Sequence, residues 1–207
     1  MNLPRELYTV RLWLRRWRMD DRAPFAKLNS DPRVLEFLPG PLSREASDAR
    51  ADRIEAHFEK HGFGLWAVEI PGITRFAGFV GLSIPPFEAP FTPCIEIGWR
   101  LDADHWNRGY ATEGARAALE FGFRCLQVDE IVSYTVPENV RSRRVMEKIG
   151  MTHSPCDDFD HPVLPEGHPL RRHVFYRLAR PTLAEHPNRL AGQEDAPRTS
   201  AEIDSRS

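Results

Sequence analysis

Residues 105–113 restrict the possible folds of this chain more than any other segment. An alternating apolar run at 95–101 comes before them, and a run with helical periodicity follows, which predicts a strand, a turn and a helix in succession. The first backbone N–H groups of a helix have no partner within it, and the helix dipole adds positive charge there. Gly109 has no Cβ, so an anion can approach its backbone closely, and Arg108 adds a guanidinium. We interpret this turn as a pyrophosphate-binding cradle.

The remaining pattern predicts a mixed α/β domain over residues 8–180. Strands are expected at residues 10–17, 65–70, 76–84, 94–101, 131–136, 151–154 and 173–178. Helices are expected at residues 23–28, 32–38, 43–61, 110–126 and 140–149. Side chains in the strand before the cradle alternate between two faces. One face holds Ile95, Ile97, Trp99 and Leu101, and the other holds Glu96, Gly98 and Arg100.

The helix that follows the cradle is amphipathic. Its apolar face consists of Ala115, Ala118, Leu119, Gly122, Phe123 and Leu126. Its charged residues, which we expect to face solvent, are Glu113, Arg116, Glu120 and Arg124. After Arg180 the apolar pattern ends, and residues 181–207 contain only Leu183, Leu190 and Ile203 as large apolar residues. A segment so poor in apolar residues cannot bury enough surface to fold, so we predict a disordered C-terminal tail.

Composition and charge argue against several classes of protein. A hydrophobic content of 41% and a charged content of 28% suit one globular domain. The net charge of -2 argues against broad binding of nucleic acid. No apolar run approaches the ~20 residues that span a bilayer, and the first residues lack a signal-peptide core. Three cysteines without a CxxC pair, namely Cys94, Cys125 and Cys156, predict reduced thiols and a cytoplasmic location.

A second motif occupies residues 137–151. Pro137 and Asn139 interrupt the preceding strand pattern, and a helix is expected to begin directly after them. Ser142 lies on the apolar stripe of that helix, and Gly150 is the expected C-terminal cap. Taken alone, the motif favours a structural reading in which Asn139 is an N-cap and Ser142 is a small core residue.

The two motifs together resemble the GNAT acetyltransferases. The acyl-CoA signature of that family is Gln/Arg-x-x-Gly-x-Gly/Ala, and its two small residues match Gly109 and Ala111, whereas Trp106 replaces the first residue. With an aromatic residue at this first position, the motif is similar to that of the Rim-type branch, whose members acetylate ribosomal-protein N-termini. The second motif resembles the family's Asn-x-x-Ser…Glu-Lys-x-Gly-Phe segment at Asn139 and Ser142. The order of expected elements is also that of the family.

This resemblance implies a fold, a cosubstrate and a set of site residues. The fold would be α/β (α+β), with a mixed, mostly antiparallel sheet whose central strands splay apart between flanking helices. Acetyl-CoA would be the cosubstrate, with its pantetheine arm along the strand backbone at Ile97 and beside Asn139. Its pyrophosphate would bind at Trp106, Arg108, Gly109, Tyr110, Ala111 and Thr112. Ser142 would protonate the departing thiolate, and a homodimer would be in keeping with the family.

Glu96 is the candidate general base. An amine must lose its proton before it attacks a thioester, and a carboxylate can accept that proton directly or through water. The family often places an acidic residue on this strand, which implies such a role for Glu96. The alternative is a structural glutamate, because Arg100 on the same face offers an ion-pair partner that would lower the pKa of Glu96.

Acidic and histidine side chains crowd residues 157–173. The residues concerned are Asp157, Asp158, Asp160, His161, His168 and His173. They are of metal-ligand types, but their spacing has no regularity, so we expect no metal and interpret the segment as a loop on the substrate side.

The sequence therefore predicts an acetyl-CoA-dependent N-acetyltransferase that works by direct attack of an amine on the thioester. The acceptor would be a protein N-terminal amine or a small amine, for instance one resembling an aminoglycoside. Two non-enzymatic alternatives are an acyl-CoA-binding module without activity and an interaction domain with a decayed site. The matches at Gly109, Ala111, Asn139 and Ser142 argue against decay.

Overall fold

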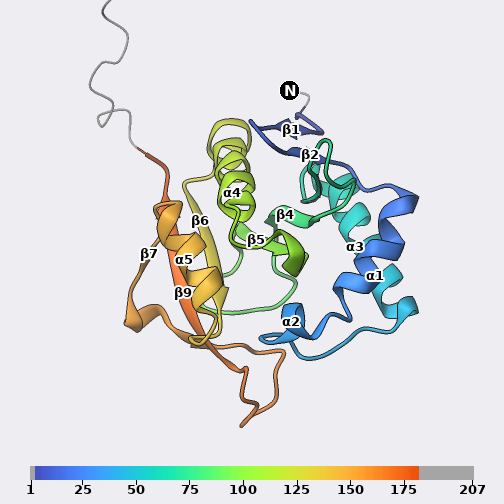
Figure 1. Cartoon of the computed structure of the whole chain (residues 1–207). Coiled ribbons are helices and arrows are strands. Elements are labelled where there is room, and N and C mark those ends of the chain that lie inside the picture. The colour runs from blue at the N-terminus through green and yellow to red at the C-terminus, as the bar shows by residue number, and fades with distance from the viewer. Residues whose placement is uncertain (1–2, 182–207) are drawn as a thin grey trace, which may run out of the picture.

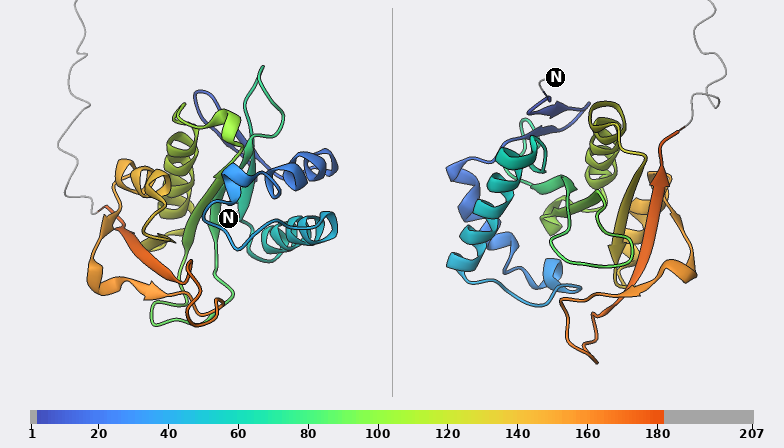
Figure 2. Two further views of the ribbon diagram at one scale, coloured as in Figure 1. Left: turned by 60° about the horizontal axis from the view of Figure 1, so that its bottom comes forward. Right: turned by 180° about the vertical axis from the view of Figure 1, so that it is seen from behind.

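The computed structural model describes residues 3–181, which form one nine-stranded sheet with helices on both faces (Figures 1 and 2). The strand order is β1-β2-β3-β4-β5-β6-β9-β7, and β8 pairs with β9 outside this path. Within the described residues, β5 and β6 are parallel and every other strand pair is antiparallel. The strands are β1 (Leu7–Tyr8), β2 (Trp13–Arg15), β3 (Leu65–Glu69), β4 (Gly78–Ser83), β5 (Glu96–Leu101), β6 (Glu130–Thr135), β7 (Thr152–His153), β8 (Phe159–Asp160) and β9 (Arg172–Ala179). This confirms the mixed, mostly antiparallel architecture.

Five α-helices flank the sheet within residues 3–181. They are α1 (Arg22–Leu28), α2 (Pro32–Leu35), α3 (Arg44–His61), α4 (Tyr110–Phe121) and α5 (Val140–Lys148). The bundle of α1 and α3 covers one face, and α4 with α5 covers the other (Figure 2). The ends of α3 follow capping rules, because Ser43 accepts a hydrogen bond from the Ala46 N–H and Gly62 takes a left-handed conformation at φ 76°.

The sequence prediction missed β1 and β8 and made the first expected strand too long. Each missed strand has two residues, which is too short for an alternating pattern to be visible. The expected strand at residues 10–17 is reduced to Trp13–Arg15, which pairs with β3. Of the expected tail at residues 181–207, residues 182–207 lie outside the described residues. No helix within residues 3–181 is both long and apolar enough to cross a membrane.

The amphipathic helix α4 packs closely on the sheet. Ala115 and Ala118 are fully buried. Directly after α4, a Cβ at Gly122 would lie 2.6 Å from Cδ1 of Ile131 on β6, so a larger residue there would require the Ile131 side chain to move. Glu113 differs from the prediction, because its side chain is only 18% exposed and points to the β1–β2 region instead of facing solvent.

The central strands β5 and β6 separate after a short contact. Their parallel register consists of Glu96 opposite Val132. Next to this point the Val132 N–H donates to the Ile95 carbonyl at 2.9 Å, and the Ser133 hydroxyl donates to the Ile97 carbonyl at 2.9 Å. Beyond Ile97 no further β5–β6 backbone pair is formed in the described part of the chain. The expected splay is therefore present, and Glu96 lies at its closed end.

Candidate active site

The cradle has the backbone geometry of an anion site. Gly109, the N-cap of α4, has φ 82°, and Asn107 before it has φ 59°. The Glu113 N–H is the first donor to a carbonyl within the helix, bonding to Gly109 at 3.0 Å. The N–H groups of Tyr110, Ala111 and Thr112 precede that bond and stay available to an anion. The predicted cradle residues thus lie together at one helix N-terminus.

Arg11 holds the cradle from the β1–β2 side. Its Nη1 donates to the Arg108 carbonyl at 2.9 Å, and its Nη2 lies 2.6 Å from the Glu113 carboxylate. The Thr9 hydroxyl also donates to Glu113, at 2.6 Å. Burial opposes ionisation of Glu113, but the hydrogen bonds from Thr9 and Arg11 outweigh it and lower its pKa. The carboxylate is neutralised by these partners, so it does not compete for the helix N-terminus.

Two of the predicted cofactor-binding residues, Trp106 and Tyr110, also stabilise the turn through their side chains. The Trp106 indole donates to the Leu101 carbonyl at 2.8 Å, and the Arg141 guanidinium lies 4.6 Å from its ring. Tyr110 is buried, with the Arg11 guanidinium 4.8 Å from its ring. These contacts are structural, and direct contact of Trp106 or Tyr110 with a cosubstrate stays a prediction.

Asn139 and Ser142 form the start of α5. The Asn139 side-chain oxygen accepts from the Ser142 N–H at 3.2 Å, and its amide donates to the Thr135 hydroxyl at 3.0 Å. Asn139 is therefore an N-cap, as its structural reading requires. The Ser142 side chain is partly exposed, and its hydroxyl makes no hydrogen bond with any residue from 3 to 181. That hydroxyl is free to meet a ligand.

Glu96 combines partial burial with one strong hydrogen bond. The Tyr134 hydroxyl, on β6, donates to the Glu96 carboxylate at 2.8 Å. Burial raises the pKa of Glu96 to about 7, although Tyr134, Arg50 and Ser83 act in the opposite direction. A carboxyl with that pKa can exchange a proton near neutral pH.

The ion pair between Glu96 and Arg100 that the alternative reading required is not formed. The Arg100 Nη1 donates instead to the side-chain oxygen of Asn29, at 2.7 Å. The two β5 residues are four positions apart, or ~13 Å along an extended strand, which keeps their side chains separate. The alternative in which Arg100 lowers the pKa of Glu96 is therefore wrong, since burial raises that pKa and Arg100 is not among the groups that act on it.

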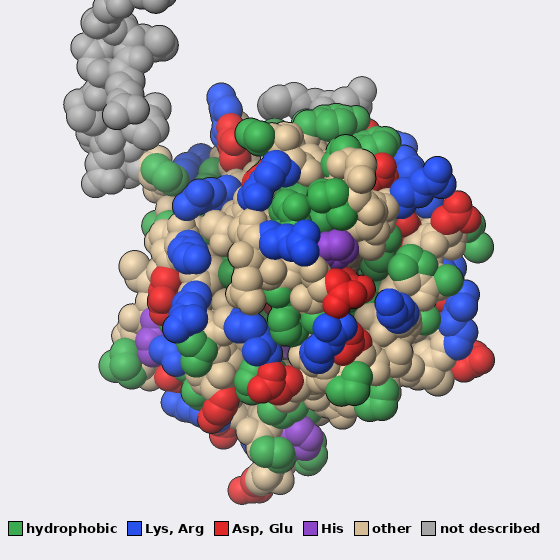
Figure 3. Space-filling view, in the orientation of Figure 1, with side chains coloured by type: hydrophobic (Ala, Val, Ile, Leu, Met, Phe, Trp, Pro, Cys, Tyr) green, Lys and Arg blue, Asp and Glu red, His purple; other side chains and the backbone are tan. Residues whose placement is uncertain are grey.

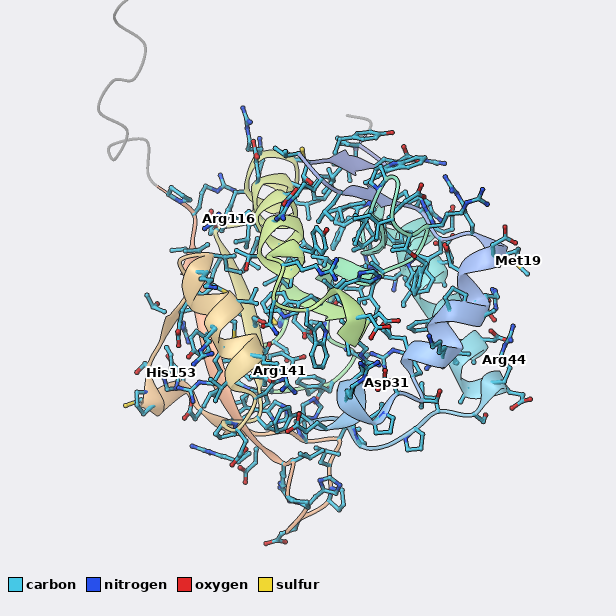
Figure 4. All side chains as sticks on the ribbon, viewed as in Figure 1. Met19, Asp31, Arg44, Arg116, Arg141 and His153 are labelled. Atoms are coloured by element: carbon cyan, nitrogen blue, oxygen red, sulfur yellow. The ribbon has the colours of Figure 1, made fainter. Side chains whose placement is uncertain are left out.

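The histidine-rich segment packs beside Glu96 through Tyr134. An aromatic cluster joins the proline-rich loop to β6, β8 and β9, and it consists of Phe87, Phe91, Tyr134, Phe159, His161, His173 and Phe175. Burial lowers the pKa of His161 and of His173. His153, labelled in Figure 4, bonds to Asp158 at 2.7 Å. No group of three or more potential metal ligands occurs among residues 3–181.

Sequence reasoning missed three residues around this site. Tyr134 and Ser133 bridge to β5 from β6, and Arg50 on α3 lies close enough to Glu96 to act on its pKa. The polar residues within the apolar run at 131–136 were the available signal for the first two. A surface hollow is lined by Tyr8, Arg11, Ile73 and Tyr110 among others, and Glu96 is not part of its lining.

Basic side chains surround the helix ends next to the splay. Figure 3 shows Lys and Arg spread over the face that carries α4 and α5, and Figure 4 labels Arg116 and Arg141 there. On α5 the basic residues are Arg141, Arg143, Arg144 and Lys148, against Glu147. Arg108 and Arg144 are exposed and have no carboxylate partner in the described part of the chain. Both guanidinium groups can therefore meet an anion.

A family model for the acetyltransferase (GNAT) domain matches residues 11–152. The chain belongs to the GNAT acetyltransferase family. The match includes the cradle, Glu96 and the start of α5, and the splay between β5 and β6 has the form that the family resemblance predicted.

Relatives with similar sequences come from several organisms. "Uncharacterized protein YkkB" of Bacillus subtilis is 33% identical over 155 residues, covering 74% of this chain and 89% of the relative. "Uncharacterized N-acetyltransferase YnaD" of the same organism is 30% identical over 170 residues, covering 82% and 94%. The "FsC-acetyl coenzyme A-N(2)-transacetylase" of Aspergillus fumigatus is 32% identical over 154 residues, covering 71% of this chain and 65% of the relative.

Solved structures share the fold. A GNAT-family acetyltransferase from Bacillus anthracis has a TM-score of 0.69 at 25% identity, covering 84% of this chain and 98% of its own. An acetyltransferase from Agrobacterium tumefaciens has a TM-score of 0.67 at 28% identity, covering 86% and 95%. A ribosomal-protein-S5-alanine acetyltransferase from Vibrio fischeri has a TM-score of 0.66 at 14% identity, covering 84% and 96%, a likeness of fold alone.

Proposed function

We propose that the protein transfers an acetyl group from acetyl-CoA to a primary amine by direct attack on the thioester. The observation that carries this proposal is the placement of Glu96. Its carboxylate lies where β5 and β6 separate, and its pKa of about 7 suits a base that works near neutral pH.

The cradle supplies the binding site for the donor in this proposal. The N–H groups of Tyr110, Ala111 and Thr112 would bind the pyrophosphate, since a positive φ at Gly109 and the absence of a Cβ keep the approach open. Arg108 and Arg144 would meet further phosphate charge. The splay would take the pantetheine arm, with the Ile97 backbone on one side and Asn139 on the other. Acetyl-CoA supplies the activated acetyl group.

Glu96 and Ser142 would then each take part in one proton transfer. Glu96 would accept a proton from the ammonium form of the acceptor, directly or through water, which leaves a lone pair for attack. The new C–N bond forms as the C–S bond breaks, and the amine's second proton passes from the nitrogen to solvent water as the amide forms. Ser142 would donate its hydroxyl proton to the leaving thiolate and regain one from solvent. Tyr134 would hold the Glu96 carboxylate in place.

The names of relatives support this chemistry without fixing the acceptor. The Aspergillus fumigatus relative is named for acetyl transfer from coenzyme A to a nitrogen, and the Bacillus subtilis relative is named an N-acetyltransferase. The acceptor here is a protein N-terminal amine or a small amine. Cys94, Cys125 and Cys156 are unpaired, which fits a reducing compartment and a cytoplasmic location.

Two measurements test the proposal. The melting temperature should rise with acetyl-CoA, and free CoA should be released when a panel of primary amines is added. Release that disappears in Glu96→Gln at neutral pH, while acetyl-CoA binding stays, would support the proposed base. Stabilisation by acetyl-CoA without CoA release from any amine would indicate the alternative, a binding module without activity. Separately, light scattering would test the homodimer that the family resemblance implies.

A further inference from the structure

The face of β5 opposite α4 has an open space at its centre. Glu96, Gly98 and Arg100 share this face, as the alternation of the strand requires. A Cβ built on Gly98 would meet a single neighbour within 4 Å, the Glu96 Oε1 at 3.9 Å. The space above Gly98, which we call the Gly98 gap, therefore has a carboxylate at one end and a guanidinium at the other.

Helix α3 runs alongside the Gly98 gap, and hydrogen bonds hold the helix in place at both ends of the gap. At the Arg100 end, Asn29 accepts from Arg100 at 2.7 Å and donates to the Ser47 hydroxyl at 2.9 Å. At the Glu96 end, His57 accepts from the Ile84 N–H at 3.2 Å, directly after Ser83. Because Ser83 is opposite Glu96 in the β4–β5 register, α3 spans the gap from Arg100 to Glu96.

Arg50 lies on the inner face of this helix. It is three residues after Ser47 and four before Ile54, both of which are buried, so it shares their side of the helix. Its side chain is partly buried and makes no hydrogen bond or ion pair with any residue between 3 and 181. Arg50 thus approaches the Gly98 gap as an unpaired cation from the α3 side.

The two guanidinium groups at the Gly98 gap therefore lack carboxylate partners within residues 3–181 that would neutralise them. Arg100 has an amide oxygen as its side-chain partner and no carboxylate among the described residues. Burial lowers the pKa of Arg100 and of Arg50, and Arg50 adds repulsion at Arg100. Arg100 still stays charged at neutral pH, because its lowered pKa is about 9. Arg50 stays charged too, because a guanidinium is effectively always protonated in proteins. Two neighbouring, partly buried cations are unfavourable unless an anion joins them.

We propose that the acceptor is a primary amine joined to a carboxylate, which Arg50 and Arg100 bind while Glu96 meets the amine. This inference rests on the proposed acetyl transfer. A guanidinium binds a carboxylate through two parallel hydrogen bonds, which makes arginine suited to this recognition. Glu96 and Arg100 are four residues apart on an extended strand, or ~13 Å between their Cα atoms. The amine and the carboxylate of the acceptor are therefore several bonds apart, as in an ω-amino acid.

Binding measurements in the presence of CoA test this inference without requiring turnover. Saturation-transfer NMR would compare 6-aminohexanoate with hexylamine, which lacks the carboxylate, on the full chain. We expect 6-aminohexanoate to bind about tenfold more tightly or better, the factor that corresponds to ~1.4 kcal/mol. β-Alanine tests the separation and should bind more weakly than 6-aminohexanoate. A peptide that begins Ala-Asp-Glu, compared with one that begins Ala-Ser-Ser, distinguishes an acidic protein N-terminus from a small molecule as the carboxylate source.

Variants identify the residues responsible. Arg50→Gln and Arg100→Gln should reduce the preference for 6-aminohexanoate to near one, with the acetyl-CoA melting shift unchanged. Arg44→Gln removes the same charge from the exposed start of α3 and should keep the preference. If Arg100→Gln fails to fold, the preference for 6-aminohexanoate measured in Arg50→Gln alone tests the inference.

The outcomes separate this inference from the proposed function. Equal binding of 6-aminohexanoate and hexylamine, or an unchanged preference in Arg50→Gln, would overturn the inference even if simple amines are acetylated. A preference that depends on Arg50, together with no CoA release from any amine, would overturn the acetyl transfer and leave the carboxylate site standing. Binding of the Ala-Asp-Glu peptide with loss in Arg50→Gln supports the carboxylate chemistry and assigns it to a protein N-terminus.

Discussion

The Tyr134 hydroxyl donates a hydrogen bond of 2.8 Å to the Glu96 carboxylate across the closed end of the splay. The two residues belong to adjacent parallel strands and are 38 positions apart in the chain. Burial raises the pKa of the Glu96 carboxyl, and the Tyr134 hydrogen bond limits that rise. The balance between these two effects sets the pH at which Glu96 can accept a proton.

Replacement of Glu96 by Gln should change both activity and its pH dependence. Wild-type turnover should rise as pH increases through about 7, because Glu96 must be ionised to act as a base. Glu96→Gln should lose about 10²–10⁴-fold in turnover at pH 6–7 and recover above the pKa of the amine. Steady-state CoA release measured from pH 5.5 to 10 gives both curves. Glu130→Gln, at the exposed start of β6, is a matched control, and an equal loss at every pH would assign Glu96 a positioning role.

The same variant should alter the pH dependence of stability. The pKa of Glu96 is higher in the folded protein than its ordinary value of 4.5, so the folded state binds its proton more tightly than the unfolded state. Stability from this group is thus present below about 4.5 and is lost as pH rises through about 7. Glu96→Gln should remove that loss and be more stable than wild type at pH 8, by roughly 1–3 kcal/mol. Urea unfolding of wild type and Glu96→Gln at pH 4 and pH 8 measures this effect. The same stability difference between pH 4 and pH 8 in both proteins would contradict the raised pKa.

Tyr134→Phe should move the activity profile to higher pH. The hydroxyl stabilises the ionised carboxylate, so its loss should raise the pKa of Glu96 further. A hydrogen bond to a charged group is worth about 1.5–3 kcal/mol, which corresponds to a displacement of about one pH unit or more. The pH–rate profile gives the displacement. Tyr176→Phe, which removes a hydroxyl bonded to Glu147, should leave the profile in place; a displacement of the same size there would discount the Tyr134 effect.

Gly109→Asp should abolish binding of acetyl-CoA. The substitution places a carboxylate at the cradle and forces a side chain into a backbone conformation with φ 82°, 3.3 Å from Arg11 Nη2. In the wild type, acetyl-CoA at ~100 times its dissociation constant should add about 2.7 kcal/mol of stability. Thermal melting with and without acetyl-CoA measures the difference. Gly167→Asp, at φ 76° with no neighbour within 4 Å, carries the same backbone strain and should keep the shift. Persistence of the shift in Gly109→Asp would remove the cradle from the donor site.

Ser142→Ala should lower turnover without weakening acetyl-CoA binding. The hydroxyl has no partner within residues 3–181, and its proposed role begins only when charge develops on the sulfur. The expected loss is about 10²-fold or less where water can replace the hydroxyl. Single-turnover CoA release and melting shifts separate the two effects. Asn139→Ala, in contrast, should reduce stability by about 0.5–2 kcal/mol through loss of the N-cap. A Ser142→Ala rate equal to wild type across pH would exclude Ser142 as the acid.

The sequence by itself determined the local parts of the site. The strand, the positive-φ glycine and the amphipathic helix form the cradle from adjacent residues, and their patterns are visible without any distant contact. The N-cap at Asn139 and the alternation that brings Glu96 and Gly98 to one face of β5 are local in the same sense.

Only the tertiary structure decided which charges meet. Arg100 pairs with Asn29, 71 positions away, and Glu113 accepts from Thr9, 104 positions away, so neither partner follows from strand or helix periodicity. Local spacing instead suggested an Arg100–Glu96 pair and an exposed Glu113. The pKa of Glu96 depends on burial beneath elements from other parts of the chain, because desolvation acts through everything that surrounds a charge. Periodicity determines the face on which a side chain lies, and packing between distant segments determines its partner.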